Sequence, residues 1–258
     1  MTTSSKNINL VLSGGGARGM AHIGVIEELI KQGFIIKSIS GTSMGALVGA
    51  VYALGKLEEY KQWLYTLGKY EVFKLVDFTL SKQGFIKGDK IFDKMGEFIS
   101  DSTFDQLPIP LSISATNIST NKEVVFKSGS VFDAVRASIS IPNVFTPVEK
   151  NDSILIDGGV VNNLPISTIK RFDGDLLVVV DVNSTHALEN TNNKLGYFDI
   201  INKSMLLLME RVTELTIEKY KPDIIIKVDG ESAGLLDFHN AQKMVEIGRS
   251  EAVKSLNK

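Results

Sequence analysis

The clearest chemical signal in the sequence is a serine between two glycines, in the stretch GTSMG at residues 41–45. This stretch matches the G-x-S-x-G pattern of serine hydrolases, in which a sharp turn between a strand and a helix presents the serine hydroxyl. Gly41 and Gly45 leave room for such a turn because they carry no side chain. A strand pattern precedes the motif, and small residues typical of a closely packed helix follow it. The context favours Ser43 as a nucleophile over a bystander serine in a glycine-rich turn.

A run of three glycines is the second motif, in GGGARG at residues 14–19. It matches the dinucleotide-binding pattern G-x-G-x-x-G, but the next predicted strand ends in SIS at 38–40, without the acidic residue that holds a ribose. A phosphate-binding P-loop is disfavoured because Met20 and Ala21 stand where that loop needs Lys and then Ser or Thr. Consecutive N–H groups at a helix start can form an oxyanion hole, and we favour this interpretation over a purely structural turn.

An aspartate followed by two glycines, Asp157-Gly158-Gly159, is the third motif. Its carboxylate could act as a general base, but Asp-Gly is also a common hairpin turn, so the motif alone decides nothing. The three histidines of the chain are scattered, cysteine is absent, and no H-E-x-x-H helix occurs. The sequence therefore predicts neither a metal site nor a cofactor.

The elements that must position these groups alternate between strand and helix. The hydrophobic pattern predicts strands at 8–13, 34–40, 111–118, 123–126, 154–156, 176–180 and 224–226, and helices at 20–32, 46–53, 91–99, 132–139 and 198–215. The apolar runs at 176–180 and 224–226 are predicted to be buried on both faces of a sheet. Such alternation is typical of an α/β fold with three α/β/α layers around a mainly parallel sheet, here as a single domain over residues 1–258.

The pattern loosens between residues 56 and 100, where aromatic residues accumulate from Trp63 to Phe85. We interpret this region as a cap or an insertion. Its aromatic side chains could form an apolar entrance or touch a bilayer surface, although ordinary core packing explains them as well.

Composition narrows the function classes. The formal net charge is −2, which lacks the basic excess used in nucleic-acid binding. The absence of cysteine excludes disulfides and thiol catalysis and fits a reducing compartment. The first residues offer a shorter apolar run than a signal peptide requires, and no apolar stretch approaches the length of a membrane-spanning helix. We therefore expect a cytoplasmic protein, whose contact with a membrane would be peripheral.

Taken in order, GGGARG, GTSMG, ASISIP at 137–142 and DGG resemble the motifs of the patatin-like phospholipase family. The resemblance spans about residues 10–165 and implies that family's α/β fold and its Ser-Asp dyad. It assigns Ser43 as nucleophile and Asp157 as base. It further implies an oxyanion hole from Gly14, Gly15 and Gly16 supported by Arg18, with Gly19, Gly41, Gly45, Gly158 and Gly159 shaping the motifs.

A dyad places a chemical demand on its base. A carboxylate with a reference pKa of about 3.9 is too weak a base for a hydroxyl unless burial raises that pKa. Ser43 would then form an acyl-enzyme, which a water activated by Asp157 hydrolyses. The resemblance implies that the substrate is a fatty acyl ester of a phospholipid or lysophospholipid.

Two other functions stay open from the sequence. An α/β-hydrolase with a Ser-Asp-His triad could use His186 or His239, although too few residues precede Ser43 for the several strands that come first in that fold. His22, within the first predicted helix, is a weaker candidate for any catalytic role. A lipid-binding module without catalysis would be expected to have lost a dyad residue or the glycines, and all of them are present.

Overall fold

A computed structural model describes residues 6–75, 88–99, 102–184 and 196–257. Its centre is one sheet in the order β5-β6-β3-β2-β1-β7-β8, with β4 pairing to the other side of β3. The five strands β3, β2, β1, β7 and β8, in the order of the sheet, run parallel to one another. Strands β4 and β6 are antiparallel to β3, and β5 is antiparallel to β6. The bounds are β1 Asn7–Leu12, β2 Ile35–Thr42, β3 Leu111–Asn117, β4 Lys122–Phe126, β5 Val148–Lys150, β6 Ser153–Asp157, β7 Leu176–Ser184 and β8 Ile224–Asp229.

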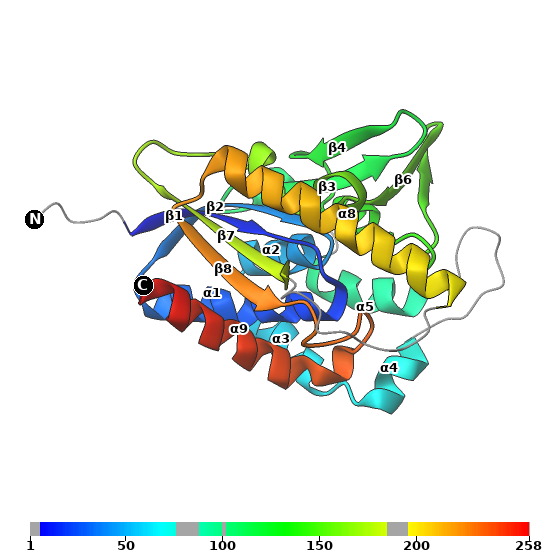
Figure 1. Ribbon diagram of the computed structural model, residues 1–258, viewed down its shortest axis with the longest axis horizontal. Helices are drawn as coiled ribbons and strands as arrows, with labels where there is room; N and C mark the ends of the chain where they lie inside the picture. The colour runs from blue at the N-terminus through cyan, green and yellow to red at the C-terminus, as the bar shows by residue number, and fades with distance from the viewer. Residues whose placement is uncertain (1–5, 76–87, 100–101, 185–195, 258) are drawn as a thin grey trace, which may run out of the picture.

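Helices cover both faces of this sheet, as Figure 1 shows for α1 and α9 on one side and α8 on the other. The alternation along β1 produces the two cores, because Leu10 and Leu12 join the cluster under α1, α2 and α9 while Val11 joins the cluster under α8. The structure thus confirms the predicted three-layer fold with a mainly parallel sheet. The helices are α1 Ala21–Lys31, α2 Met44–Ala53, α3 Leu57–Tyr65, α4 Lys69–Leu75, α5 Asp89–Ile99, α6 Val131–Ser138, α7 Gly159–Asn162, α8 Tyr197–Tyr220 and α9 Ala241–Leu256.

One expectation about the strands is wrong. The run at 224–226 was expected to be buried on both faces, but it begins β8, which is the edge strand of the sheet. Ile224 and Ile225 are only partly buried, and the next residues alternate between exposed and buried. An edge strand has a neighbour on one side alone, so its backbone and side chains stay half open to solvent.

The described part of the predicted cap, 56–75 and 88–99, forms helices α3, α4 and α5. Tyr60, Trp63 and Phe98 pack against one another with ring centroids 5.3 to 5.7 Å apart. They belong to the main core or pack on it, so these helices are continuous with the α/β body. Phe78 and Phe85 lie outside the described residues, and the limits of the cap stay a prediction.

Helices α1 and α9 approach each other closely through two glycines. A Cβ atom on Gly24 would collide with the carbonyl oxygen of Val245, and a Cβ atom on Gly248 would collide with that of Ala21. This contact brings the last helix of the chain against the helix that follows the triple-glycine loop. The C-terminal residues therefore help to hold that loop in place.

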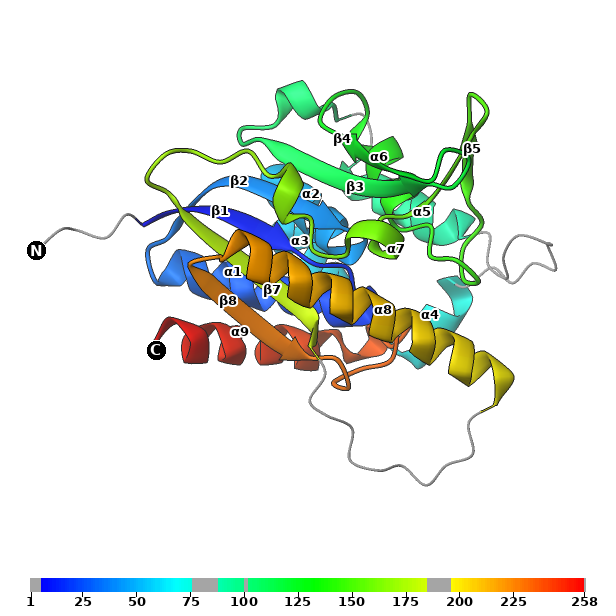
Figure 2. The same cartoon turned by 45° about the horizontal axis from the view of Figure 1, so that its top comes forward.

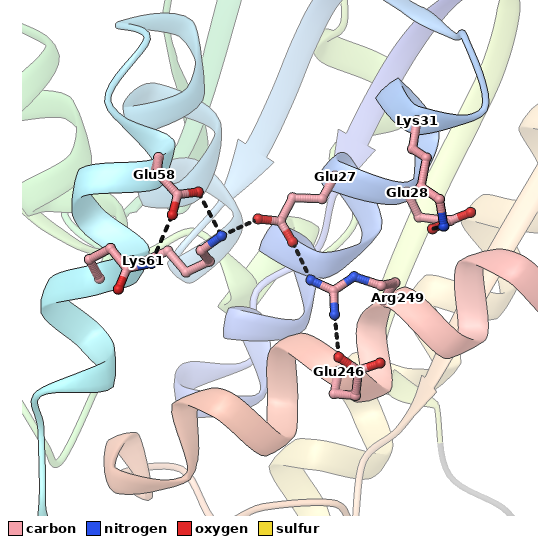
Figure 3. A network of polar contacts seen from close by, with 8 residues as sticks. Glu27, Glu28, Lys31, Glu58, Lys61, Glu246 and Arg249 are labelled. Carbon is pink, nitrogen blue, oxygen red and sulfur yellow. Dashed lines mark hydrogen bonds and ion pairs between the residues drawn. The ribbon is translucent and has the colours of Figure 1, made fainter.

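An ion-pair network links the same two helices to α3 (Figure 3). Glu27 of α1 accepts hydrogen bonds from Lys61 of α3 at 2.6 Å and from Arg249 of α9 at 2.6 Å. Glu58 and Glu246 add a second carboxylate to each cation. A network of partly buried pairs holds its side chains at a lower entropic cost than isolated surface pairs, because each side chain serves two partners.

We expect Gly24→Ala and Gly248→Ala each to lower the free energy of unfolding by about 1 to 3 kcal/mol, because the added methyl group forces α1 and α9 apart. Chemical denaturation followed by circular dichroism measures the change. Ser250→Ala is the control, since this residue lies on the exposed side of α9. Glycine variants as stable as the control would contradict the close contact.

Candidate active site

The sheet brings the ends of two strands together on one edge of β3. Thr42, the last residue of β2, pairs with Ser114, and Asp157, the last residue of β6, pairs with Ala115. Because β4 occupies the opposite edge of β3 along both stretches, β2 and β6 share the same edge and meet end to end. Ser43 follows β2 directly. The fold therefore places the serine and the aspartate of the two motifs side by side, although 113 residues of chain separate them.

Ser43 sits in the sharp turn that its motif predicts. Its φ of 54° and ψ of −123° lie outside the regions that side-chain-bearing residues prefer, at the junction of β2 and α2. A Cβ atom on Gly41 would lie 2.5 Å from the carbonyl oxygen of Gly45, and one on Gly45 would collide with the carbonyl oxygen of Leu12. Both glycines are therefore needed where the turn crosses the end of β1.

A second serine, which sequence reasoning did not single out, supports this turn. The backbone N–H of Ser43 donates to Oγ of Ser138 at 2.8 Å, and that hydroxyl donates to the carbonyl oxygen of Ser114 at 2.6 Å. Ser138 ends α6 within the stretch ASISIP. The motif was recognised, but its physical role as a brace between β3 and the strained turn comes from the structure.

Asp157 is buried and directly engaged. Its Oδ1 accepts a hydrogen bond of 2.7 Å from the N–H of Gly159. Burial raises the pKa of the Asp157 carboxyl to about 6, against the opposing effect of hydrogen bonds from the Ser43 side chain and from Gly159. Gly158 is packed so tightly that a Cβ atom there would collide with the carbonyl oxygen of Ser114. The carboxylate is thus held dry and beside Ser43, as a base for a hydroxyl requires.

The triple-glycine loop lies next to Ser43, but the backbone N–H groups of its three glycines differ in whether they can bind a substrate oxygen. The N–H of Gly14 donates to the carbonyl oxygen of Asn163 at 3.1 Å, so it is not available to a substrate oxygen. Within the described ranges, no carbonyl accepts the N–H of Gly15 or Gly16. Gly16 has a φ of 55° and borders the same pocket as Ser43. The predicted oxyanion role therefore fits Gly15 and Gly16 and does not fit the N–H of Gly14.

Arg18 supports the loop from behind through the C-terminal part of the chain. Its guanidinium donates to Oδ1 of Asn183 at 2.7 Å and to the carbonyl oxygen of Gly230 at 2.8 Å. The side-chain amide of Asn183 in turn donates to the carbonyl oxygen of Gly14. Burial lowers the pKa of Arg18, while the charges of two aspartates, at 181 and 229, act against that shift. Arg18 thus anchors the glycine loop and does not itself reach the site.

Gly19 and Gly159 complete the set of glycines that the motifs singled out. A Cβ atom on Gly19 would collide with the side chain of Met44, the residue after Ser43. One on Gly159 would lie 3.0 Å from Oδ1 of Asp157 and 3.1 Å from Oδ1 of Asn163. Both glycines let neighbouring segments approach the serine and the aspartate closely.

An apolar pocket opens from Ser43 and has about 800 Å³ of empty space, counting the part open to solvent. Helices α2 to α5 supply much of its wall, and the segment after β8 adds three further side chains. Apart from Gly16, Ser43 and the Tyr60 hydroxyl, its lining is apolar. The lining residues are Gly16, Ser43, Met44, Leu47, Tyr60, Trp63, Leu64, Leu67, Val72, Leu75, Ile91, Met95, Ile139, Ile141, Phe145, Leu235, Leu236 and Phe238. The predicted apolar entrance corresponds in part to this pocket.

The histidines do not assemble a triad in the described structure. His22 is buried, its Nε2 lies 2.8 Å from the carbonyl oxygen of Ser13, and burial lowers its pKa to about 4, so it is neutral. His239 follows Phe238 in a short 3₁₀ turn, and no contact with Ser43 is recorded for it in the part of the chain that is described. His186 lies outside the described residues.

The described residues contain no cluster of three or more His, Asp or Glu side chains that could hold a metal ion. Nor does any of their helices combine the length and apolar character needed to cross a membrane.

Comparison with known proteins places the chain in a family. The family model described as patatin-like phospholipase matches residues 10–169, which is more than half of the chain. An uncharacterized NTE family protein of Mycobacterium tuberculosis is 28% identical over 332 aligned residues, which cover 98% of this chain and 92% of the relative. Lysophospholipase nte1 of Emericella nidulans is 31% identical over 203 residues, which cover 76% of this chain but only 13% of that much longer protein.

A solved structure shares the fold. The crystal structure of VipD from Legionella pneumophila superimposes with a TM-score of 0.55 at 15% sequence identity, over 98% of this chain and 67% of that one. The similarity to VipD and to the mycobacterial relative includes the C-terminal residues, which carry no motif but anchor the glycine loop. The sequence match, the four ordered motifs and the shared fold together show that this chain belongs to the patatin-like phospholipase family.

Proposed function

We propose that this protein is a lipid acyl hydrolase in which Ser43 attacks the ester carbonyl and Asp157 is its base. The observation that carries the proposal is the contact between a strained serine, which lines an apolar pocket, and a buried carboxyl whose pKa is raised to about 6. Perturbed groups of this kind, set in a cavity, are typical of catalytic sites.

The reaction follows from the positions of these groups. Oγ of Ser43 forms a bond to the carbonyl carbon while its proton passes to the Asp157 carboxylate. The negative oxygen of the tetrahedral intermediate lies toward the N–H groups of Gly15 and Gly16, at the positive end of the helical segment that begins there. The intermediate then expels the alcohol, which takes the proton from Asp157. Water repeats the cycle on the acyl-enzyme and releases the fatty acid.

Direct contact between the two side chains supports a dyad over a triad. In a triad the imidazole stands between serine and carboxylate, and the carboxylate stays ionised to orient it. Here the Ser43 side chain interacts directly with the Asp157 carboxyl and opposes the rise of its pKa, as expected of the two members of a dyad. The raised pKa also gives Asp157 the basicity that a relay partner does not need.

The pocket supports a substrate with a long apolar chain. Its lining offers almost no polar partner beyond Ser43, as suits a site for an apolar ligand. A fatty acyl chain satisfies this chemistry, because the ester group then lies at Ser43. The relative named lysophospholipase favours acyl esters of phospholipids or lysophospholipids within that class.

We expect Ser43→Ala and Asp157→Asn each to reduce hydrolysis of a short-chain nitrophenyl ester by at least about a thousandfold, without any added metal ion. Initial rates and labelling with a fluorophosphonate probe, followed by peptide mapping, measure the two roles. His186→Ala and His239→Ala are the matched controls and should keep full activity. Loss of activity in either histidine variant, or labelling at a residue other than Ser43, would show that the dyad is wrong.

The pH dependence of kcat/KM should show the ionisation of Asp157, the proposed base. Because Asp157 must be ionised to accept the proton and its pKa is about 6, kcat/KM should fall about tenfold per pH unit below pH 6 and level off above pH 7. Rates with a substrate that does not titrate give this profile. A plateau that extends down to pH 5 would mean that Asp157 is not the base.

The same shift predicts a stability change. The native-state pKa of Asp157, about 6, lies above its unperturbed value of 3.8, so ionising this group costs native stability as the pH rises from about 4 through about 6. Asp157→Asn removes that cost and should raise the free energy of unfolding at pH 8 by about 1 to 3 kcal/mol, with a gain that shrinks toward pH 4. Urea denaturation at several pH values measures it. A gain independent of pH would contradict the buried charge.

A further inference from the structure

Helix α8 is poorly covered by the rest of the protein. Among its side chains that the structure describes, only that of Thr213 is buried. Seven large apolar side chains of this helix are exposed, and Leu208 is 69% exposed. They are Ile200, Ile201, Leu206, Leu207, Leu208, Val212 and Leu215. A globular protein rarely leaves so much apolar surface together unless something binds there.

Most of these side chains form one stripe that points away from the protein. At 100° per residue, six of the seven fall within an arc of about 140°, and only Leu206 lies outside it. The packed side of the helix is on the far side of this arc, where Met209, Thr213 and Ile217 meet the body. An amphipathic surface helix normally turns its apolar stripe to the core. Here the apolar stripe faces outward instead.

Helix α8 passes close to the candidate active site through its packed side. The Cε atom of Met209 is 3.1 Å from the position of a Cβ atom on Gly159, the residue whose N–H binds Asp157. Figures 1 and 2 both show the N-terminal half of α8 extending past the tips of β7 and β8, toward the end of the molecule where α4 lies. This is also the end at which the strands deliver Ser43 and Asp157. The helix that carries the stripe therefore lies next to the region around the site.

Two other elements near the site also expose apolar side chains. Val72 and Leu75 of α4 line the pocket, whereas Tyr70 and Phe73 of the same helix are 63% and 64% exposed. In α7, which directly follows Asp157, the side chains at 160 and 161 are exposed valines. Apolar surface thus occurs on α4, α7 and α8, which lie around the serine and the aspartate.

We propose that the outer stripe of α8, with the exposed residues of α4, docks the protein on a lipid–water interface and presents the site to its substrate there. This inference rests on the proposed function, because a long-chain acyl ester resides in such an interface. A lipid surface fits better than a second copy of the chain, since the exposed side chains belong to several separate elements and a fluid surface can contact all of them. Interfacial helices bury their apolar face in this way.

The charge of the protein decides the lipid to be tested. With a formal net charge of −2, the chain has no general attraction to anionic lipid, so docking must come from apolar burial. Vesicles of zwitterionic phosphatidylcholine are therefore the probe. The Ser43→Ala background keeps the vesicles intact during the measurement and makes binding independent of catalysis.

The experiment compares two double variants that remove similar apolar area. Leu207→Gln/Leu208→Gln alters side chains of α8 that are 55% and 69% exposed. Ile30→Gln/Ile35→Thr alters side chains that are 47% and 56% exposed, at the end of α1 and the start of β2, away from the carboxyl ends of the strands. Flotation with vesicles should show binding of the Ser43→Ala protein that falls roughly tenfold in the α8 variant and is unchanged in the control.

Activity and assembly complete the test. With Ser43 restored, the α8 variant should hydrolyse a soluble nitrophenyl ester at the unaltered rate but lose roughly tenfold on vesicle-borne lysophospholipid. Loss on the soluble ester in every protein would overturn the proposed function, whereas unaltered vesicle binding in the α8 variant would overturn docking alone.

Sedimentation velocity should show a monomer. A dimer that the α8 substitutions dissociate would assign the stripe to a second copy and overturn the lipid surface.

Discussion

The edge that β2 and β6 share on β3 is the constraint on which the rest of the site depends. Two strands that run in opposite directions meet there end to end, so each delivers its last residue to the same place. Ser43 is placed in a strained turn, and Asp157 is placed in a buried position. Burial raises the aspartate's pKa, which would otherwise be too low for a base. In the dyad proposed above, two side chains take the place of the three of a Ser-His-Asp triad.

The arrangement of the site restricts which side chains can stand around it. The glycines at 41, 45, 158 and 19 each stand where a methyl group would strike backbone or a neighbouring side chain. The Ser43 backbone is itself in an unfavourable conformation, held by the hydroxyl of Ser138. Buried charge and backbone strain at a site lower the free energy of unfolding, and favourable contacts elsewhere in the structure offset this loss. The ion pairs around Glu27 and the close contact of α1 with α9 are among these contacts.

What could be predicted from the sequence depended on how local the information was. The turn at Ser43 and most strands and helices are encoded within a few residues, and these predictions were confirmed. Ser138 and Asn183 act on segments 95 and 169 residues away, so only the fold reveals their hydrogen bonds. The same holds for Gly14, whose N–H meets Asn163. The hydrophobic pattern predicted the helix at 198–215 but could not say which way its apolar side faces, because spacing shows which residues share a side of a helix and not what that side contacts.

The anchoring of Arg18 to the C-terminal part of the chain has a consequence for the order of assembly during synthesis. Ser43 and Asp157 leave the ribosome early, but Asn183 and Gly230, which hold the guanidinium and through it the glycine loop, come later. Until β7 is made, β1 has an open edge where its second parallel neighbour belongs. A nascent chain that already contains both reactive side chains therefore lacks the fixed loop beside them. The glycine loop beside the proposed site is therefore anchored only after the segment through Gly230 has been made.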